Sequence, residues 1–168
     1  MRDSPFKNRL TTLRVGDPVR LAGPFGSLTL PLDRARAIVL IAGGIGVTPF
    51  VSISRQAEHD QRNQRILILY SNRRPEDAAY LSELTQRAQR NSHIALVATM
   101  TGMERSTRRW DGERSRVDTA LLARLTEGFP QALYFIAGPP EMVDAIQQAA
   151  QRLGVADDAI RSEEFFGY

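Results

Sequence analysis

The chain has 168 residues, 42% of them hydrophobic and 24% charged, which suits one globular core with a small appendage. It contains no cysteine, which excludes disulfides, thiolate nucleophiles and Cys-ligated metal or iron–sulfur centres, and we expect a cytoplasmic protein without a metal site. The net charge is +3 without a basic stripe of interleaved aromatics, and no apolar run reaches the ~20 residues of a membrane span, so neither nucleic-acid binding nor membrane insertion is expected.

Residues 1–36 are interpreted as the C-terminal remnant of an antiparallel β-barrel domain. Ser4 followed by Pro5 predicts a capped helix that runs to Leu10 or Leu13. Residues 19–22 and 28–30 flank the turn sequence Gly-Pro-Phe-Gly, which predicts a hairpin of two short strands. A helix and one hairpin cannot enclose a core of their own, so the beginning of such a barrel is absent from the sequence.

Residues 37–168 alternate strands and helices, as expected of a doubly wound α/β domain with a five-stranded parallel sheet. The strands are predicted at 37–42, 65–70, 94–100, 133–137 and 160–166. Helices are predicted from Pro49 to about His59 and over 77–90, 119–125 and 141–153, with Asp118 as a cap and Gly154 as a stop. Residues 101–116 are polar and arginine-rich and form a long loop in this scheme, anchored by Trp110.

A glycine-rich turn follows the first strand of this domain and reads Gly43-Gly44-Ile45-Gly46-Val47-Thr48-Pro49. Glycines let the backbone approach a pyrophosphate, and the helix that follows offers free N–H groups and a favourable dipole. A tight turn that needs positive φ explains the same residues without a ligand. The spacing also differs from the Gly-x-Gly-x-x-Gly fingerprint, because Pro49 stands where its last glycine is expected.

Three further segments accompany this turn in chain order: Ser71-Asn72-Arg73-Arg74, Gly138-Pro139-Pro140-Glu141-Met142, and the tail Glu163-Glu164-Phe165-Phe166-Gly167-Tyr168. Together with the glycine turn they resemble the pyridine-nucleotide domain of the ferredoxin–NADP reductase-like flavoprotein family over residues 37–168. Upstream, residues 23–28 are similar to the hairpin that closes the FAD-binding barrel in that family.

The resemblance implies hydride transfer from NADPH or NADH to FAD, with electrons passed on to an acceptor that the sequence does not identify. The acceptor is either a protein or a small molecule. The flavin-gripping motif Arg-x-Tyr-Ser of the family does not occur here. The alternative is therefore a non-catalytic or partner-dependent NAD(P)-binding module without its own tightly bound flavin, whose FAD barrel a partner or a missing N-terminal segment would complete.

By resemblance, the glycine turn lies under the nicotinamide ribose and the pyrophosphate. Four residues after the fourth strand would flank the nicotinamide from the other side: Gly138, Pro139, Pro140 and Met142. The segment Arg2-Asp3-Ser4 resembles the one on which the family's FAD pyrophosphate rests. The family often has cysteine where Ala137 stands, which suggests a variant subfamily.

The resemblance also assigns three residues to the reacting rings. Thr48 would face the nicotinamide–flavin junction, and a simple helix cap is its alternative role. Glu163 would orient the nicotinamide amide or relay a proton to flavin, with a surface glutamate in a polar tail as the alternative. Tyr168 would stack on the flavin, with a frayed terminus as the alternative.

The residues after the second strand are candidates for the adenosine end of the nucleotide. Arg73 and Arg74 offer guanidinium forks to a 2′-phosphate, and Ser71 and Asn72 stand beside them in the sequence. This arrangement favours NADP over NAD, although two solvated loop arginines explain it equally simply. A weaker candidate for ribose or pyrophosphate contact lies at the end of the third strand, at Thr99 with Thr101.

Overall fold

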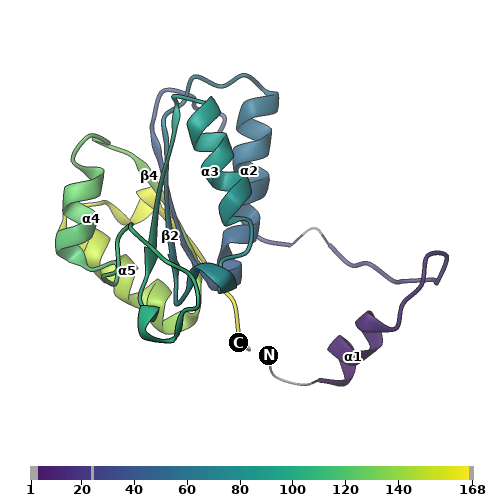
Figure 1. The fold of residues 1–168 in the computed structure, drawn as a ribbon. Helices are drawn as coiled ribbons and strands as arrows, with labels where there is room; N and C mark the ends of the chain where they lie inside the picture. The colour runs from purple at the N-terminus through teal and green to yellow at the C-terminus, as the bar shows by residue number, and fades with distance from the viewer. Residues whose placement is uncertain (1–3, 24, 167–168) are drawn as a thin grey trace.

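The computed structural model describes residues 4–23 and 25–166, and its core is one five-stranded parallel sheet (Figure 1). The strand order is β3-β2-β1-β4-β5. The strands are β1 (Ile38–Gly43), β2 (Ile66–Asn72), β3 (Ile94–Met100), β4 (Leu133–Gly138) and β5 (Ile160–Glu164). The predicted doubly wound α/β fold and its five strands are therefore confirmed, with small shifts at the strand ends.

Strand β1 is the centre of the sheet, and every one of its residues is buried. Parallel pairing places Ala42 of β1 opposite Tyr70 of β2 on one side and opposite Ala137 of β4 on the other. Because these neighbours run in the same direction and in register, the turns that follow β1, β2 and β4 emerge at one edge of the sheet.

Four helices cover the sheet, two on each face (Figure 1). One face carries α2 (Thr48–His59) and α3 (Leu81–Arg90), and the other carries α4 (Thr119–Thr126) and α5 (Pro140–Arg152). Leu40 belongs to the apolar cluster that includes Phe50 of α2, whereas Ile41 belongs to the cluster that includes Ile146 of α5. Successive residues of a strand point to opposite faces, so one unbroken apolar run supplies both cores.

Local signals in the sequence mark most helix ends correctly. Asp118 caps α4 by accepting a hydrogen bond at Oδ1 from the Leu121 amide at 2.8 Å, and Pro49 lies in the first turn of α2. Gly154 follows α5 with a φ of +80°, the left-handed conformation expected of a helix-ending glycine.

The start of α3 differs from the prediction. The helix predicted over 77–90 begins at Leu81, and Pro75–Asp77 forms a separate 3-10 turn. Tyr80, with a φ of +60°, interrupts the helical backbone between the two. The hydroxyl of Tyr70 donates to the Ala79 carbonyl at 3.0 Å, so a contact from β2 holds this irregular segment.

Residues 4–23 and 25–26, here called the arm, extend away from the sheet (Figure 1). Helix α1 (Pro5–Thr11) forms as predicted, with the Ser4 hydroxyl oxygen accepting from the Lys7 amide at 3.2 Å, and none of its residues is buried. The predicted hairpin is wrong, because the described residues between 12 and 36 contain no strand. An isolated hairpin has too little apolar surface to hold two strands together without a neighbouring sheet.

The chain joins the sheet domain immediately after the arm, within residues 27–36. Leu28 and Leu30 pack against the core on the side of α2 and α3. Arg62 donates through Nη1 to the Pro31 carbonyl at 2.7 Å. These contacts begin before the expected end of the first domain, and the division into a barrel remnant and a nucleotide domain stays a prediction.

Tyr70 offers a test of the core beside β1. Its side chain is buried, and this burial raises the pKa of the phenol from 10.0 to about 12. Because the folded pKa is the higher one, the protonated phenol stabilises the fold fully below about pH 10, and this contribution is lost as the pH rises through 12.

We expect Tyr70→Phe to lower the free energy of unfolding in urea at pH 7 by about 1 kcal/mol, because the bond to the Ala79 carbonyl is lost. The difference between the ultraviolet pH titrations of the native and variant proteins should have a midpoint near 12. A midpoint near that of an ordinary tyrosine would contradict the buried environment.

Candidate functional site

Strands β1 and β4 are neighbours in the sheet, but the chain leaves them in opposite directions. From β1 it continues to β2 and β3, and from β4 it continues to β5 at the other edge. The turns that follow β1 and β4 therefore diverge to opposite faces, because α2 and α5 cover different faces. In open parallel sheets this switch point is where a crevice for ligands forms.

The two turns interlock, with close contacts at Gly43 and Gly46. A Cβ atom on Gly43 would lie 2.7 Å from Met142 Cε and 3.0 Å from Pro139 Cδ. A Cβ atom on Gly46 would lie 2.5 Å from the carbonyl carbon of Ala137 and 2.8 Å from the Gly138 amide nitrogen. At Gly46 the clash is with backbone that cannot move aside, so glycine is required there. At Gly43 the nearest atoms belong to the flexible end of Met142 and to the Pro139 ring, so a side chain would force Met142 to shift.

Gly44 differs from these two glycines. Its φ is +53°, and a Cβ atom built on it would meet no atom within 4 Å. A 3-10 turn, Gly44–Val47, leads directly into α2, and the Thr48 amide donates to the Ile45 carbonyl. No side chain caps the start of this 3-10 turn, so the open backbone at Gly44 is the part of the motif that can receive a phosphate group.

The remaining residues of the glycine turn support it from within. Val47 is fully buried in the core, and Pro49 lies in the first turn of α2. The Thr48 hydroxyl donates to the Ile45 carbonyl at 3.1 Å. This bond closes the turn locally, but it is not a helix cap, because Val47 is the N-cap of α2 and no side chain caps it. The role of Thr48 at the reacting rings stays a prediction.

The segment after β2 lines a second hollow at the same edge of the sheet. A cavity of about 450 Å³ is lined by the residues Arg73, Arg74, Asp77, Thr101, Gly102, Glu104, Arg105 and Arg116. Arg74 forms a bidentate pair with Asp77, at 2.6 Å from Nε and 2.9 Å from Nη2, and this carboxylate raises the pKa of the Arg74 guanidinium. Ser71 and Asn72 complete β2 just before the cavity and are half-buried.

Arg105 and Arg116 were missed as site residues, although they face the same cavity as Arg73. The arginine content of residues 101–116 is the signal in the sequence that points to them. Thr99 is placed differently from its expected role. It is buried, and its hydroxyl donates to the Ser115 carbonyl, so it anchors this loop and has no free face for a ribose.

Glu113 organises the loop that carries these arginines. Its carboxylate accepts from the Ser115 hydroxyl at 2.7 Å, from the amides of Ser115 and Arg114, and from Arg124 at 2.9 Å. The Ser115 hydroxyl, the two amides and Arg124 together hold the pKa of Glu113 at about 2, well below its ordinary 4.5. Trp110 donates through Nε1 to the Glu113 carbonyl at 2.9 Å, which confirms its expected role as an anchor.

Glu163 lies at the end of β5, where it is paired with Ala137 of β4. Its Oε1 atom accepts from the amides of Ser27 at 2.5 Å and Leu28 at 3.2 Å. The backbone of Glu163 therefore lies beside the end of β4, and its carboxylate contacts the residues that follow the arm. Its role at the nicotinamide stays a prediction. Of the other expected contacts, Arg2, Asp3 and Tyr168 lie outside the described residues.

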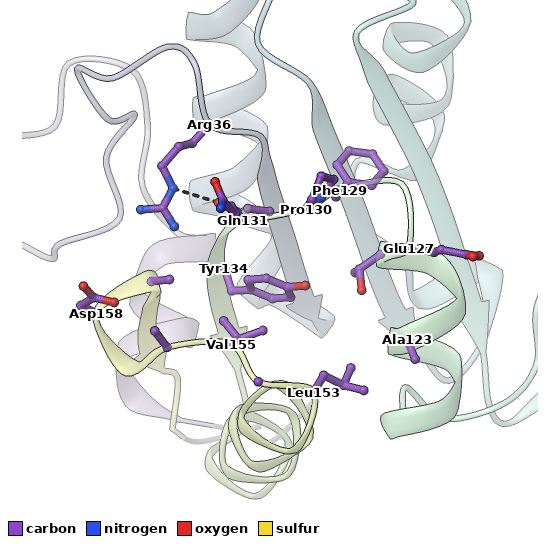
Figure 2. A pocket seen from close by; sticks show the side chains of 15 residues that line it. Arg36, Ala123, Glu127, Phe129, Pro130, Gln131, Tyr134, Leu153, Val155 and Asp158 are labelled. Atoms are coloured by element: carbon purple, nitrogen blue, oxygen red, sulfur yellow. Dashed lines mark hydrogen bonds between the residues drawn. The ribbon is translucent and has the colours of Figure 1, made fainter.

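A larger cavity, of about 700 Å³, lies at the opposite end of the sheet (Figure 2). Tyr134, near the start of β4, forms its floor, and Phe129, Pro130, Leu153 and Val155 line its sides. Size alone would make it the first candidate for a ligand site. Sheets of this kind bind ligands at the carboxyl ends of their strands, so we place the functional site at the edge where the turns after β1, β2 and β4 emerge.

Neither a metal site nor a membrane-spanning helix is present in the part of the chain that the structure describes. No group of three or more His, Cys, Asp or Glu side chains there could hold a metal ion. None of the described helices combines the length and the apolar character needed to cross a membrane.

Comparison with known proteins agrees with this geometry. The family model for the oxidoreductase NAD-binding domain matches residues 40–148. NADH-cytochrome b5 reductase 1 of Coccidioides immitis is 28% identical over 89% of this chain and 50% of its own length. The carnitine monooxygenase reductase subunit of Escherichia coli is 30% identical over 91% of this chain and 42% of its own length.

Among solved structures, a ferredoxin–NADP+ reductase from Neisseria gonorrhoeae with bound FAD and NADP superposes with a TM-score of 0.78 at 23% identity. The match covers 99% of this chain and 72% of that one. At 23% identity, this structural similarity shows only that the two proteins share a fold. The chain spans about half the length of the curated relatives it matches, so the activity of those whole proteins does not transfer to it directly.

Substitution by alanine should destabilise the protein more at Gly46, which is packed against β4, than at Gly44, which has open space around it. We expect Gly46→Ala to lower the free energy of unfolding by about 3 kcal/mol, because its Cβ meets backbone of β4. Gly44→Ala should cost about 1 kcal/mol, the penalty of a left-handed backbone alone. Gly154→Ala, at a φ of +80° in open space, is the matched control, and urea unfolding measures all three. Equal losses at positions 44 and 46 would contradict the interlocked turns.

The hydrogen bonds that the Glu113 carboxylate accepts from Arg114, Ser115 and Arg124, here called the Glu113 cluster, predict that the loop 101–116 changes conformation at acid pH. Since the pKa of Glu113 is lowered to about 2, its contribution to stability is complete above about pH 4.5 and is lost as the pH falls through 2. Trp110 is the single tryptophan, so its fluorescence reports this loop. We expect a fluorescence change near pH 2 in the native protein.

The variant Glu113→Gln should lack that acid transition and should show altered Trp110 fluorescence already at pH 7. Trypsin should also cleave its loop faster at Arg108 and Arg109, which are exposed. Glu104→Gln, on the same loop outside the cluster, is the control. Identical acid titrations of native protein and Glu113→Gln would show that Glu113 does not hold the loop.

Proposed function

Because the chain belongs to the oxidoreductase NAD-binding domain family, in its ferredoxin–NADP reductase-like branch, we propose that it binds a pyridine nucleotide and serves hydride transfer to a flavin. The observation that carries this proposal is the open backbone of Gly44 between two interlocked turns. The family match spans that turn and the β4 turn that packs on it.

The residues of the crevice suit the parts of the nucleotide in a definite order. The backbone at Gly44, at the uncapped start of the 3-10 turn Gly44–Val47, binds the pyrophosphate. Gly138, with a φ of +158°, and Pro139 form the wall on the β4 side, where the nicotinamide ring lies. Bound NAD(P)H supplies a hydride, and the protein supplies the position from which it is transferred.

The arginine cavity after β2 is assigned to the adenosine end. Arg74 is already paired with Asp77, so Arg73, Arg105 and Arg116 are the guanidinium groups available to a 2′-phosphate. This favours NADP. The relatives differ on this point, since the name of one specifies NADH and a solved structure contains NADP.

FAD is the proposed hydride acceptor, in keeping with its presence in the Neisseria gonorrhoeae structure. The flavin-gripping motif Arg-x-Tyr-Ser of the family does not occur in the sequence. Of the expected pyrophosphate contacts only Ser4 is described, and its hydroxyl already caps α1. We therefore assign no step of the chemistry to residues that hold the flavin.

A second candidate function is a nucleotide-binding module that acts only with flavin-binding structure from elsewhere. The arm favours it, because its large apolar residues are exposed: Phe6, Leu10, Val15, Val19, Leu21 and Phe25. So many exposed large apolar residues on one segment suit a contact with other protein. The terminal electron acceptor would then be a protein, as the names of the reductase relatives suggest for those proteins. A cytoplasmic location stays a prediction.

The visible absorption spectrum of the purified chain with FAD distinguishes the two candidates. We expect FAD to bind and its absorbance to bleach under anaerobic NADPH, with NADH less effective. Retention of NADPH binding without retention of flavin would establish the second candidate. Loss of both would contradict the proposal.

The nucleotide preference has its own test. We expect Arg73→Ala and Arg116→Ala each to weaken NADPH binding by about tenfold and to leave NADH binding unchanged, because each removes a charged partner of the 2′-phosphate. Isothermal titration calorimetry measures both affinities. Arg90→Ala, at the end of α3 and outside the cavity, is the control. Equal losses for both nucleotides would assign the cavity to another part of the ligand.

A further inference from the structure

We propose that Glu163 is a positioning residue that latches the arm to the wall of the crevice. The contact stands on the geometry alone, and its consequence for hydride transfer rests on the function proposed above. The latch consists of the Glu163 carboxylate and the turn Gly26–Leu28 at the root of the arm.

The two partners of this latch come from opposite ends of the chain. Glu163 Oε1 accepts from the amides of Ser27 at 2.5 Å and Leu28 at 3.2 Å, across 136 and 135 residues of sequence. On the other side, the Glu163 backbone is paired with Ala137, immediately before the β4 turn that walls the crevice. The Phe165 amide, two residues later, donates to the Gly138 carbonyl at 2.9 Å. Glu163 therefore connects the root of the arm directly to the crevice wall.

The backbone of the turn is shaped for a carboxylate. Gly26 has a φ of +112°, and a Cβ atom on it would lie 2.5 Å from Glu163 Oε1. Successive amides around such a glycine converge on an anion, and a carboxylate receives stronger hydrogen bonds than a neutral group. The glycine is needed here both for its conformation and for the space it leaves to Glu163.

The latch lies where the exposed arm meets the packed core. No residue of α1 is buried, whereas Leu28 packs against the core. Glu163 therefore holds the chain at the point where it passes from the exposed arm to the packed core. If the arm belongs to the flavin side, this contact sets the distance between flavin and nicotinamide. Hydride transfer needs the reacting atoms within about 3–3.5 Å, so a loose arm would slow it.

Hydrogen exchange at the Ser27 and Leu28 amides tests the contact without any nucleotide. We expect Glu163→Ala to accelerate exchange at both amides by about tenfold or more, because a charge-assisted bond is lost. Glu163→Gln should give a smaller acceleration, since its amide oxygen still accepts. Glu164→Ala is the control, an exposed neighbour on β5. Unchanged exchange in Glu163→Ala would overturn the proposal.

The turn itself provides the second test. Gly26→Ala should accelerate exchange at the Leu28 amide as Glu163→Ala does, because its Cβ displaces the carboxylate. Gly16→Ala, at a φ of +99° with open space around it, carries the same backbone penalty and should leave exchange unchanged. The double variant Gly26→Ala/Glu163→Ala should exchange no faster than either single variant. Additive effects would show that the two residues act separately, against the latch.

A kinetic comparison separates positioning from proton relay. We expect Glu163→Ala to slow flavin reduction about tenfold while its affinity for NADPH stays within about twofold of the native value, alongside faster exchange at Ser27 and Leu28. Slower reduction with unchanged exchange would overturn the latch in favour of direct action on the reacting groups. Failure of the native protein to bind NADPH would refute the proposed function and leave the exchange result to decide the latch.

Discussion

The approach of two glycine-containing turns at the β1–β4 boundary is the constraint on which the rest of this structure depends. Gly43 and Gly46 lie where any Cβ atom would strike Met142, Pro139 or the backbone of Ala137. This close contact sets where α2 and α5 begin, because each helix starts within a few residues of the contact. It also leaves Gly44 as the open point between the turns, so adjacent glycines in one motif allow both the close packing and the proposed contact with the nucleotide.

Short-range signals in the sequence predicted the parts of the fold that depend on them. The apolar run of β1, the Asp118 cap and the Gly154 stop each act within a few residues, and each was interpreted correctly. The hairpin and the start of α3 failed for the opposite reason. The first requires a neighbouring sheet, and the second is decided by a contact from Tyr70 on β2 and by the left-handed backbone of Tyr80.

The candidate site shows the same division. The glycine turn and the β4 turn were predicted because their residues are contiguous, and the structure brings them together. Arg116 reaches the cavity of Arg73 only through the folding of a long loop around Glu113. The partners of Glu163 are 136 and 135 residues away in the chain, a separation at which a single sequence carries no pattern. Contacts between residues this far apart in the chain arise from tertiary packing. Here they hold the arm at a definite place relative to the sheet.

The central claim is that the crevice between the β1 and β4 turns, and not the larger cavity beside Tyr134, binds the pyridine nucleotide. Backbone amide chemical shifts measured by NMR during titration with NADPH test it most directly. The account predicts the largest shifts at Gly43, Gly44 and Gly46 and at Gly138, with smaller ones around Arg73. Shifts concentrated at Phe129, Tyr134 and Val155 instead would contradict it, because those residues line the cavity at the opposite end of the sheet.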